Sequence, residues 1–195
     1  MWHNPEVHYR RNWGNTLPMS KRRLTMIEIE QAQLVFASSL ETERVVLHEE
    51  ITWPNRIANF GATLHGNNPP SHNAITLANH IYFPIKLSTD PTINAEVALK
   101  HMAWLIHELT HSWQYQMRGI GYFFRALGVQ IRLGPQAYAY GWESGLEQAL
   151  ARGATFSDFN PEQQGEITRH YYYRLKRGLD ISAWRPWIQA IHASA

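Results

Sequence analysis

The feature that most constrains the fold is a long helical pattern that begins at Asn94 and stops at Gly119. Asn94 is a good N-cap, Glu96 places an acid in the first turn, and Gly119 is a natural residue just past a last turn. Apolar residues occupy much of the circumference of this segment, and a helix of that kind is buried on most sides. The sequence therefore predicts a central helix over residues 94–118, around which the rest of the chain packs.

Weaker patterns on both sides of this helix predict an α+β fold in which helices dominate. The expected elements are a helix from Ser20, its cap, with Leu24, Ile27, Leu34 and Phe36 on one face, a strand at 44–50, two short strands at 74–77 and 80–84, a helix from Asn160 to about Gly178, and a closing helix at 182–192. Residues 55–72 have the glycine and proline content of a loop, and 121–145 is an aromatic stretch punctuated by glycine. Residues 1–19 have no period and are interpreted as an extension or linker, which leaves 20–195 as one domain.

Composition and charge exclude several classes of protein. The 195-residue chain has 11 histidines but no cysteine, which excludes disulfides and thiolate metal ligands and leaves histidine sites open. Its net charge is only +2, and the longest basic run, 21–23, is interpreted as a solvated helix start, so no nucleic-acid partner is expected. No run approaches the roughly 18 apolar residues of a membrane span, and the first residues lack a signal-peptide pattern. We therefore expect a dedicated machine or a fused carrier to move the protein if it leaves its cell.

The central helix contains the sequence HELTH at residues 107–111. His107 and His111 are about one helical turn apart, so both imidazoles project from one face and can bind a single metal ion. Glu108 lies about 100° around the helix from His107, beside the metal rather than on it, where its carboxylate can take a proton from the attacking water. A zinc site that keeps one position open for water needs a third protein ligand. The pattern therefore predicts a catalytic zinc site whose third ligand is a further His, Asp or Glu.

The third ligand is expected on the helix that follows Asn160. A third histidine in the spacing of the metzincins is absent from the sequence after His111. Glu162, Glu166 and His170 instead form a stripe at intervals of four residues. One of them can bind the metal while its neighbour supports a ligand histidine from behind.

Two blocks of the sequence carry a resemblance to a known family. The runs LIHELTHSWQ at 105–114 and NPEQQGEI at 160–167 resemble bacterial zincin-like domains. Such domains occur alone or at the C-terminal ends of secreted polymorphic toxins, including VgrG spike proteins and Rhs-type proteins of type VI secretion. Weaker similarity extends over roughly residues 23–175, at 23–25, 35–36, 44–45, 74–76 and 81–83.

This resemblance implies a gluzincin-like fold and a zinc-dependent peptidase that acts on a protein or peptide substrate. Zinc is then held by the two helix histidines and a glutamate of the following helix. The resemblance also implies synthesis in a bacterial cytoplasm and delivery by a secretion system to the periplasm or cytoplasm of a target cell. A secretion carrier and an immunity protein are the partners that such a role implies.

The resemblance also favours one glutamate over the other. Gluzincin-like families commonly place the ligand glutamate first, a small residue three positions on and a polar residue at four. Glu162, Gly165 and Glu166 fit that order, although alanine is usual in the family where this chain has Gly165. Glu162 is therefore the favoured ligand, and Glu166 is the supporting residue or the alternative ligand.

Two alternatives to a peptidase remain open at this point. One is a zinc-stabilised domain that binds a partner without turnover, and the other is a metallohydrolase that acts on cell-wall or other non-protein amides. The intact Glu108 argues against the first, because a purely structural site needs only its ligands. Tyr138, Tyr140 and His170 are candidate donors of a hydrogen bond to the transition state. The run GWESG at 141–145 resembles a nucleophile elbow only superficially, because its serine is one place late for GxSxG.

Overall fold

The computed structural model describes residues 20–51, 74–119, 121 and 134–194. The predicted extension at 1–19, the predicted loop at 55–72 and much of the aromatic stretch at 121–145 lie outside the described residues. Within the described ranges, helices dominate and pack on one side of a small mixed sheet, and the predicted α+β class is confirmed.

Helix α3, Ala95–Arg118, is the predicted central helix. The Asn94 side chain accepts a hydrogen bond from the backbone N–H of Val97 at its start. At its end Gly119, in a left-handed conformation with a φ of 72°, donates its N–H to the carbonyl of Tyr115. The caps read from the sequence therefore set both ends of the helix.

A four-stranded mixed sheet packs against one side of α3. Its strands are β1 (Ser20–Arg22), β2 (Val46–Glu49), β3 (Ile75–Leu77) and β4 (His80–Tyr82), in the order β1-β2-β4-β3. β2 and β4 are parallel, and the other neighbours are antiparallel. β3 and β4 form the predicted pair of short strands, and Ala78 in their turn has a left-handed conformation. β3 and β1 are the edge strands of the described sheet, and Thr76 of β3 lies opposite Ile81.

The described chain begins as a strand, so the prediction of a helix from Ser20 is wrong. Helix α1 (Met26–Phe36) begins after a capping box formed by Thr25 and Glu28. The guanidinium of Arg22 lies 2.7 Å from the Glu28 carboxylate and 2.8 Å from that of Glu49. The basic run at 21–23 is therefore not a solvated helix start, because its central residue joins β1 to α1 and β2 through buried carboxylates.

The apolar face predicted for this first helix is confirmed at Leu24 and Phe36, which are buried, and wrong at Ile27 and Leu34. Ile27 and Leu34 are 37% and 40% exposed. The buried positions of α1 are Glu28, Ala32, Val35 and Phe36. The buried side of α1 therefore includes the carboxylate of Glu28. A search for apolar residues misses such a position, because a carboxylate can be buried when a cation is paired with it.

Three helices follow in the second half of the chain, within the part that the structure describes. They are α5 (Trp142–Ala151), α6 (Pro161–Lys176) and α7 (Arg185–His192), with short 3-10 turns at Gly134–Tyr138 and Phe156–Asp158. A further 3-10 turn, Thr42–Arg44, lies between α1 and β2. The side chain of Asn160 accepts a hydrogen bond from the N–H of Gln163, as the predicted cap of α6. α5 was not predicted, because Gly141 and Gly145 at its start are typical of turns.

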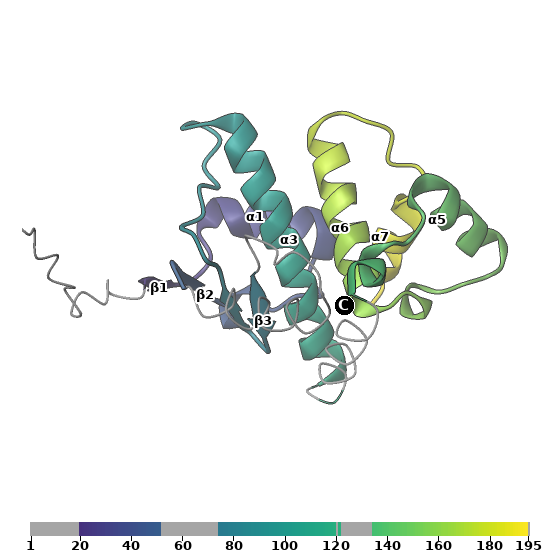
Figure 1. The fold of residues 1–195 in the computed structure, drawn as a ribbon, viewed down its shortest axis with the longest axis horizontal. Helices are drawn as coiled ribbons and strands as arrows, with labels where there is room; N and C mark the ends of the chain where they lie inside the picture. Colours follow the sequence, from purple (N-terminus) through teal and green to yellow (C-terminus); the bar gives the residue numbers. More distant parts are fainter. Residues whose placement is uncertain (1–19, 52–73, 120, 122–133, 195) are drawn as a thin grey trace, which may run out of the picture.

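α3 is the middle layer of the molecule, with the sheet on one side and α6 on the other (Figure 1). α1 packs against α3, α6 and α7. Fully buried apolar side chains of α3 and the sheet, Leu105, Ile106, Leu109, Leu47 and Ile81, form the centre of the core. This packing fixes the α3–α6 interface, which carries the predicted site. No helix among the described residues is long and apolar enough to cross a membrane.

Candidate metal centre

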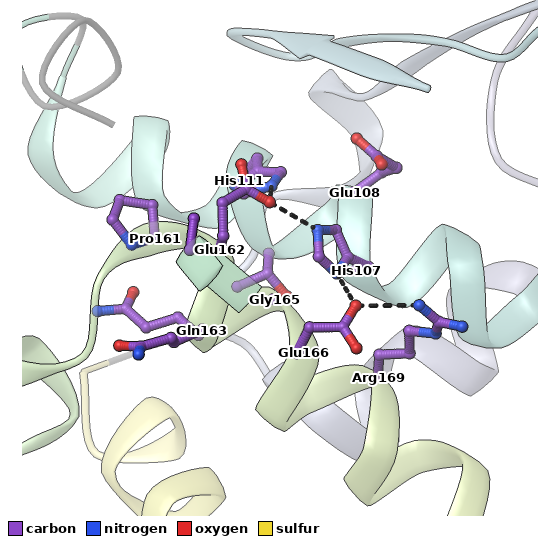
Figure 2. Close-up of polar contacts among 12 residues, drawn as sticks. His107, Glu108, His111, Pro161, Glu162, Gln163, Gly165, Glu166 and Arg169 are labelled. Atoms are coloured by element: carbon purple, nitrogen blue, oxygen red, sulfur yellow. Dashed lines mark hydrogen bonds and ion pairs between the residues drawn. The ribbon is translucent and has the colours of Figure 1, made fainter. Parts of the chain in front are cut away.

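The interface between α3 and α6 brings together the three predicted ligands, His107, His111 and Glu162. One ligand atom from each lies within 4.8 Å of the others. Oε2 of Glu162 is 3.3 Å from Nε2 of His107 and 3.6 Å from Nε2 of His111. Figure 2 shows the carboxylate facing both rings. The three predicted ligands therefore meet at one point, while their binding of a metal stays a prediction.

The identity and the spacing of these atoms fit zinc. Two imidazole nitrogens and one carboxylate oxygen are a donor set of catalytic zinc sites that keep one position open. Tetrahedral zinc with bonds of about 2.0–2.1 Å places neighbouring ligand atoms about 3.4 Å apart. The two measured separations, 3.3 and 3.6 Å, lie on either side of that value. These three residues could therefore hold the ion with little rearrangement.

Gly165 allows α6 to approach His107 this closely. A Cβ at position 165 would lie 2.7 Å from Cε1 of the His107 ring and 2.9 Å from both of its nitrogens. The imidazole therefore packs directly on the backbone of α6. The sequence indicated a small residue at this position, and the contact leaves no room for a Cβ unless the His107 ring shifts.

A glutamine on α3 orients His111. Oε1 of Gln114 lies 2.9 Å from Nδ1 of His111, and Nε2 of Gln114 donates to the carbonyl of Pro161 and to Oε1 of Gln164. Because the amide nitrogen is engaged as a donor, Oε1 accepts a hydrogen bond from the Nδ1–H of His111, which leaves Nε2 free as a ligand. Sequence reasoning missed Gln114 and Gln164. The available signal was the place of Gln114 one turn after His111.

Glu166 occupies the corresponding position behind His107. Its Oε1 lies 3.0 Å from Nδ1 of His107 and 3.0 Å from the guanidinium of Arg169 (Figure 2). Glu162 faces the Nε2 atom that points toward His111, whereas Glu166 faces the opposite ring nitrogen. Only the first position allows a carboxylate to share one metal with both histidines, so the geometry favours Glu162 as the ligand.

The carboxylates around the two imidazoles favour positive charge at this point. Burial alone would lower the pKa of His107, but its contacts with Glu162 and Glu166 outweigh burial and raise the pKa to about 10. Burial likewise opposes protonation of His111, and Glu162 raises the pKa of that ring. The pKa of Glu162 is lowered despite burial by the two histidines, and that of Glu166 is lowered to about 2, mainly by His107. Surroundings that stabilise an imidazolium also stabilise a divalent cation between the same groups.

Glu108 lies beside the three residues rather than among them. Figure 2 shows it next to His107 and apart from Glu162, with no contact drawn between the two carboxylates. It is 6% exposed, and its Oε2 accepts a 2.7 Å hydrogen bond from the hydroxyl of Thr76 on β3. Sequence reasoning missed Thr76, because only the packing of the sheet on α3 brings it to a residue 32 positions away. Thr76 fixes the orientation of the predicted general base.

Tyr140 and His170 lie on the Glu166 side of His107. The hydroxyl of Tyr140 is 2.8 Å from Nδ1 of His170 and accepts a hydrogen bond from Nε1 of Trp184. Nε2 of His170 is 3.4 Å from Oε2 of Glu166. Burial raises the pKa of Tyr140 and lowers that of His170 to about 4, so a neutral hydroxyl meets a neutral ring. These contacts fit support of Glu166 better than donation to a substrate oxygen, and the predicted donor role of both residues stays untested.

The remaining sequence candidates are Tyr138 and the serine of the GWESG run. The ring of Tyr138 lies 6.2 Å from that of His107, centroid to centroid, so this residue remains the best placed of the three candidate donors. Ser144 is exposed in the first turn of α5, and its hydroxyl donates to the carbonyl of Gly141. That contact gives Ser144 a local role in the turn.

Comparison with known proteins relates the chain to type VI secretion. Over 165 residues it is 32% identical to the type VI secretion system spike protein VgrG2b of Pseudomonas aeruginosa. The matched region covers 83% of this chain but only 14% of the spike protein, so the chain spans about a seventh of its relative. No family model and no solved structure matches the chain. The expected relation to spike proteins is confirmed at this level, whereas the zincin-like classification stays a prediction.

Proposed function

We propose that the protein is a zinc-dependent peptidase domain that works in type VI secretion. The observation that carries the proposal is the position of Glu108. Two histidines and Glu162 offer three ligand atoms at one point. A fourth side chain, the carboxylate of Glu108, lies beside them and is held by Thr76 rather than by the ligands. A site built only for structure has no use for an oriented carboxylate next to the ion.

In the proposed hydrolysis, Glu108 transfers the proton, and Gln114 and Glu166 orient the two ligand histidines. Zinc, when bound, supplies a Lewis acid that polarises the scissile carbonyl and lowers the pKa of the attacking water. Glu108 accepts the proton of that water and delivers it to the leaving amine. Gln114 and Glu166 hold the two imidazoles from behind, so that the ligand atoms keep their directions through the reaction.

The edge of the sheet offers a place for an extended substrate. β3 is one of the two edge strands of the described sheet, and its Thr76 contacts Glu108. A peptide that pairs with this edge as an added strand lies next to the general base, with its backbone hydrogen bonds satisfied by β3. This placement favours a peptide over the other amide substrates that HExxH chemistry allows.

The similarity to a spike protein supports a secreted effector. The matched segment is a small part of VgrG2b. This fits an effector domain that a larger secreted protein carries, or one that is related to a domain of such a protein. We infer that a secretion carrier delivers the domain to a target cell and that an immunity protein protects the producing cell. A protein delivered in this way needs no membrane span or signal peptide of its own.

The proposal is tested by Glu108→Gln. Because the amide keeps the shape of the side chain but cannot accept the proton, hydrolysis should fall by at least about 100-fold while zinc content stays at one per chain. The measurement combines metal analysis with hydrolysis of a denatured protein substrate and with growth of cells that express the domain.

The matched control is Glu30→Gln, an exposed acid of α1 that contacts no site residue. It should retain wild-type hydrolysis and zinc content. Unchanged hydrolysis by Glu108→Gln would contradict the proposed role of Glu108 as the proton acceptor. A different result would favour a zinc-stabilised domain that binds a partner without turnover. In that case the wild type binds zinc but hydrolyses no protein, and Glu108→Gln affects the growth of expressing cells as the wild type does.

A further inference from the structure

The GWESG run forms a tight turn that presents Trp142 to His170 and to the pocket that Glu166 also lines, behind the candidate metal centre. Gly141 has a φ of 85° and Trp142 a φ of 55°, so two consecutive residues are left-handed. A Cβ at Gly145 would lie 2.2 Å from the carbonyl oxygen of Tyr140, which requires glycine there. A bulky residue in a left-handed conformation is strained, and such strain concentrates at functional positions. The chain thus keeps a strained backbone to place one indole ring.

The indole ring forms part of an aromatic pocket. It stacks on the ring of His170 at 4.3 Å between centroids, with an angle of 27° between the planes, and yet Trp142 is 58% exposed. A cavity of about 300 Å³ opens here, and its lining residues are Tyr138, Ala139, Tyr140, Gly141, Trp142, Glu166 and His170. Pockets of this size that combine aromatic walls with a few polar groups are typical of ligand sites.

The pocket adjoins the candidate metal centre through two of its lining residues. Glu166 contacts Nδ1 of His107 at 3.0 Å, and the ring of Tyr138 lies 6.2 Å from the His107 ring. The pocket therefore begins at the His107 ring, on the Nδ1 side that Glu166 contacts, and Nε2 of the same ring is the expected ligand atom. The pocket is a continuation of the proposed catalytic site rather than a separate surface.

The charges at the pocket select an uncharged occupant. The carboxylate of Glu166 is already paired with Arg169 and His107. His170 is neutral at physiological pH, since burial lowers its pKa. With its ionised group paired and its walls aromatic, the pocket offers stacking and apolar contact instead of an ion pair.

We propose that this pocket binds an aromatic side chain of the substrate, one that flanks the cleaved bond, and that Trp142 determines this preference. The inference rests on the proposed peptidase function and names the substrate class for that site. Proteins with phenylalanine, tyrosine or tryptophan in accessible extended segments are the substrates it selects.

The first experiment measures binding without catalysis. Zinc-loaded Glu108→Gln protein labelled with ¹⁵N is titrated with N-acetyl-phenylalaninamide and, in parallel, with N-acetyl-alaninamide. The indole signal of Trp142, identified by its loss in Trp142→Asn, should shift with the phenylalanine probe alone. The indole signal of Trp113, which is 4% exposed on α3, should not move. An unmoved Trp142 signal, or equal shifts with both probes, overturns the pocket assignment.

The second experiment measures cleavage preference with a pair of peptides that carry phenylalanine or alanine beside the cleaved bond. Trp142→Asn removes the ring without adding strain, because asparagine tolerates a left-handed conformation. It should reduce kcat/KM for the phenylalanine peptide about tenfold and leave the alanine peptide unchanged. Trp142→Phe should keep most of the preference. Leu150→Ala, which removes an apolar side chain 50% exposed on the same helix but outside the pocket, is the matched control.

The two experiments separate failure of this inference from failure of the proposed function. Cleavage of both peptides at equal rates, with no shift of the Trp142 signal, overturns the aromatic pocket and leaves the peptidase intact. A shifted Trp142 signal in a protein that cleaves no peptide overturns the peptidase and the role of the pocket in substrate choice, and leaves only a site for aromatic groups.

Discussion

Gly165 is the residue whose contact geometry makes the sharpest prediction about the metal centre. An added methyl group would lie 2.7 Å from Cε1 of His107. A free imidazole can turn away from such a contact, but an imidazole that binds a metal cannot. We therefore expect Gly165→Ala to lower zinc affinity by roughly 10–100-fold, as the loss of a supporting contact does, while the metal-free protein unfolds at nearly the same urea concentration.

Competition for zinc against a chelator measures this change. Gly121→Ala is the matched control, because a Cβ at that position meets no atom within 4 Å, and it should bind zinc like the wild type. Equal affinities for the Gly165 variant and the wild type would show that His107 is not held in this orientation by a metal.

Single residues of the site could be predicted from the sequence where the spacing between them places their side chains on one face of a helix. His107, Glu108 and His111 follow from one helical turn, and Glu162 from a stripe on a second helix. Thr76 could not be predicted, because its role depends on which sheet edge packs against α3. The sequence identifies chemically suited residues, whereas the partners that orient them come from contacts between distant elements.

At the scale of elements, the first turns of α6 separate two acids that the sequence alone leaves close to equivalent. Glu162 faces the Nε2 atoms of both histidines, and Glu166 faces Nδ1 of His107. Glu162→Ala should therefore remove one of three protein ligands and lose more zinc affinity than Glu166→Ala. The latter should lose roughly 10–100-fold, because the imidazole it supports remains present.

A chelator titration of both variants, with thermal unfolding in the presence and absence of excess zinc, measures the difference. Zinc should restore the stability of Glu166→Ala at lower concentration than that of Glu162→Ala, since the stabilisation grows with the logarithm of the ratio of zinc concentration to Kd. If Glu166→Ala proves the more damaging, the ligand is one turn further along α6 and the carboxylate of Glu162 has another role.

Helices with strong caps were predictable, and elements that depend on tertiary pairing were not. Asn94 and Asn160 mark the starts of α3 and α6 in sequence and structure alike. β1 was predicted as a helix, because three residues carry too little pattern to indicate a strand that exists only through its pairing with β2. α5 was missed for a different reason. Gly145 serves close packing on the carbonyl of Tyr140, whereas Gly141 has a positive φ, and the sequence alone cannot tell a glycine required by packing from a turn glycine.

At the scale of the whole molecule, one buried cluster of charges ties the N-terminal elements to the α3 side of the fold. Arg22 on β1 contacts Glu28 on α1 and Glu49 on β2. Glu28 also accepts a hydrogen bond from Thr89, and Glu49 accepts one from the backbone of Leu87, in the segment that leads to α3. The cluster therefore connects four segments that no local pattern relates.

This cluster makes the stability of the protein depend on pH through Glu28, which is fully buried. Burial opposes its ionisation, but hydrogen bonds from Arg22, the Thr25 backbone and Thr89 outweigh burial and lower its pKa from the ordinary 4.5. A carboxyl whose pKa is lower in the folded state contributes stability that is fully present above the unfolded pKa and is lost as pH falls through the folded value. The loss should therefore develop below about pH 4.5.

Glu28→Gln tests this dependence, because it keeps the size of the side chain and removes its charge. At pH 7 the variant should be less stable by about 1–3 kcal/mol, the cost of a lost charged hydrogen bond at a buried site where Arg22 retains Glu49. Below pH 4.5 the difference from the wild type should shrink, because protonation removes the same charge from the wild type.

Urea unfolding followed by circular dichroism from pH 7 to pH 3 measures the free energy of unfolding of both proteins. Glu30→Gln on the exposed face of α1 should follow the wild type throughout. A difference between Glu28→Gln and the wild type that stays constant over this range would mean that Glu28 contributes by packing and not by its charge.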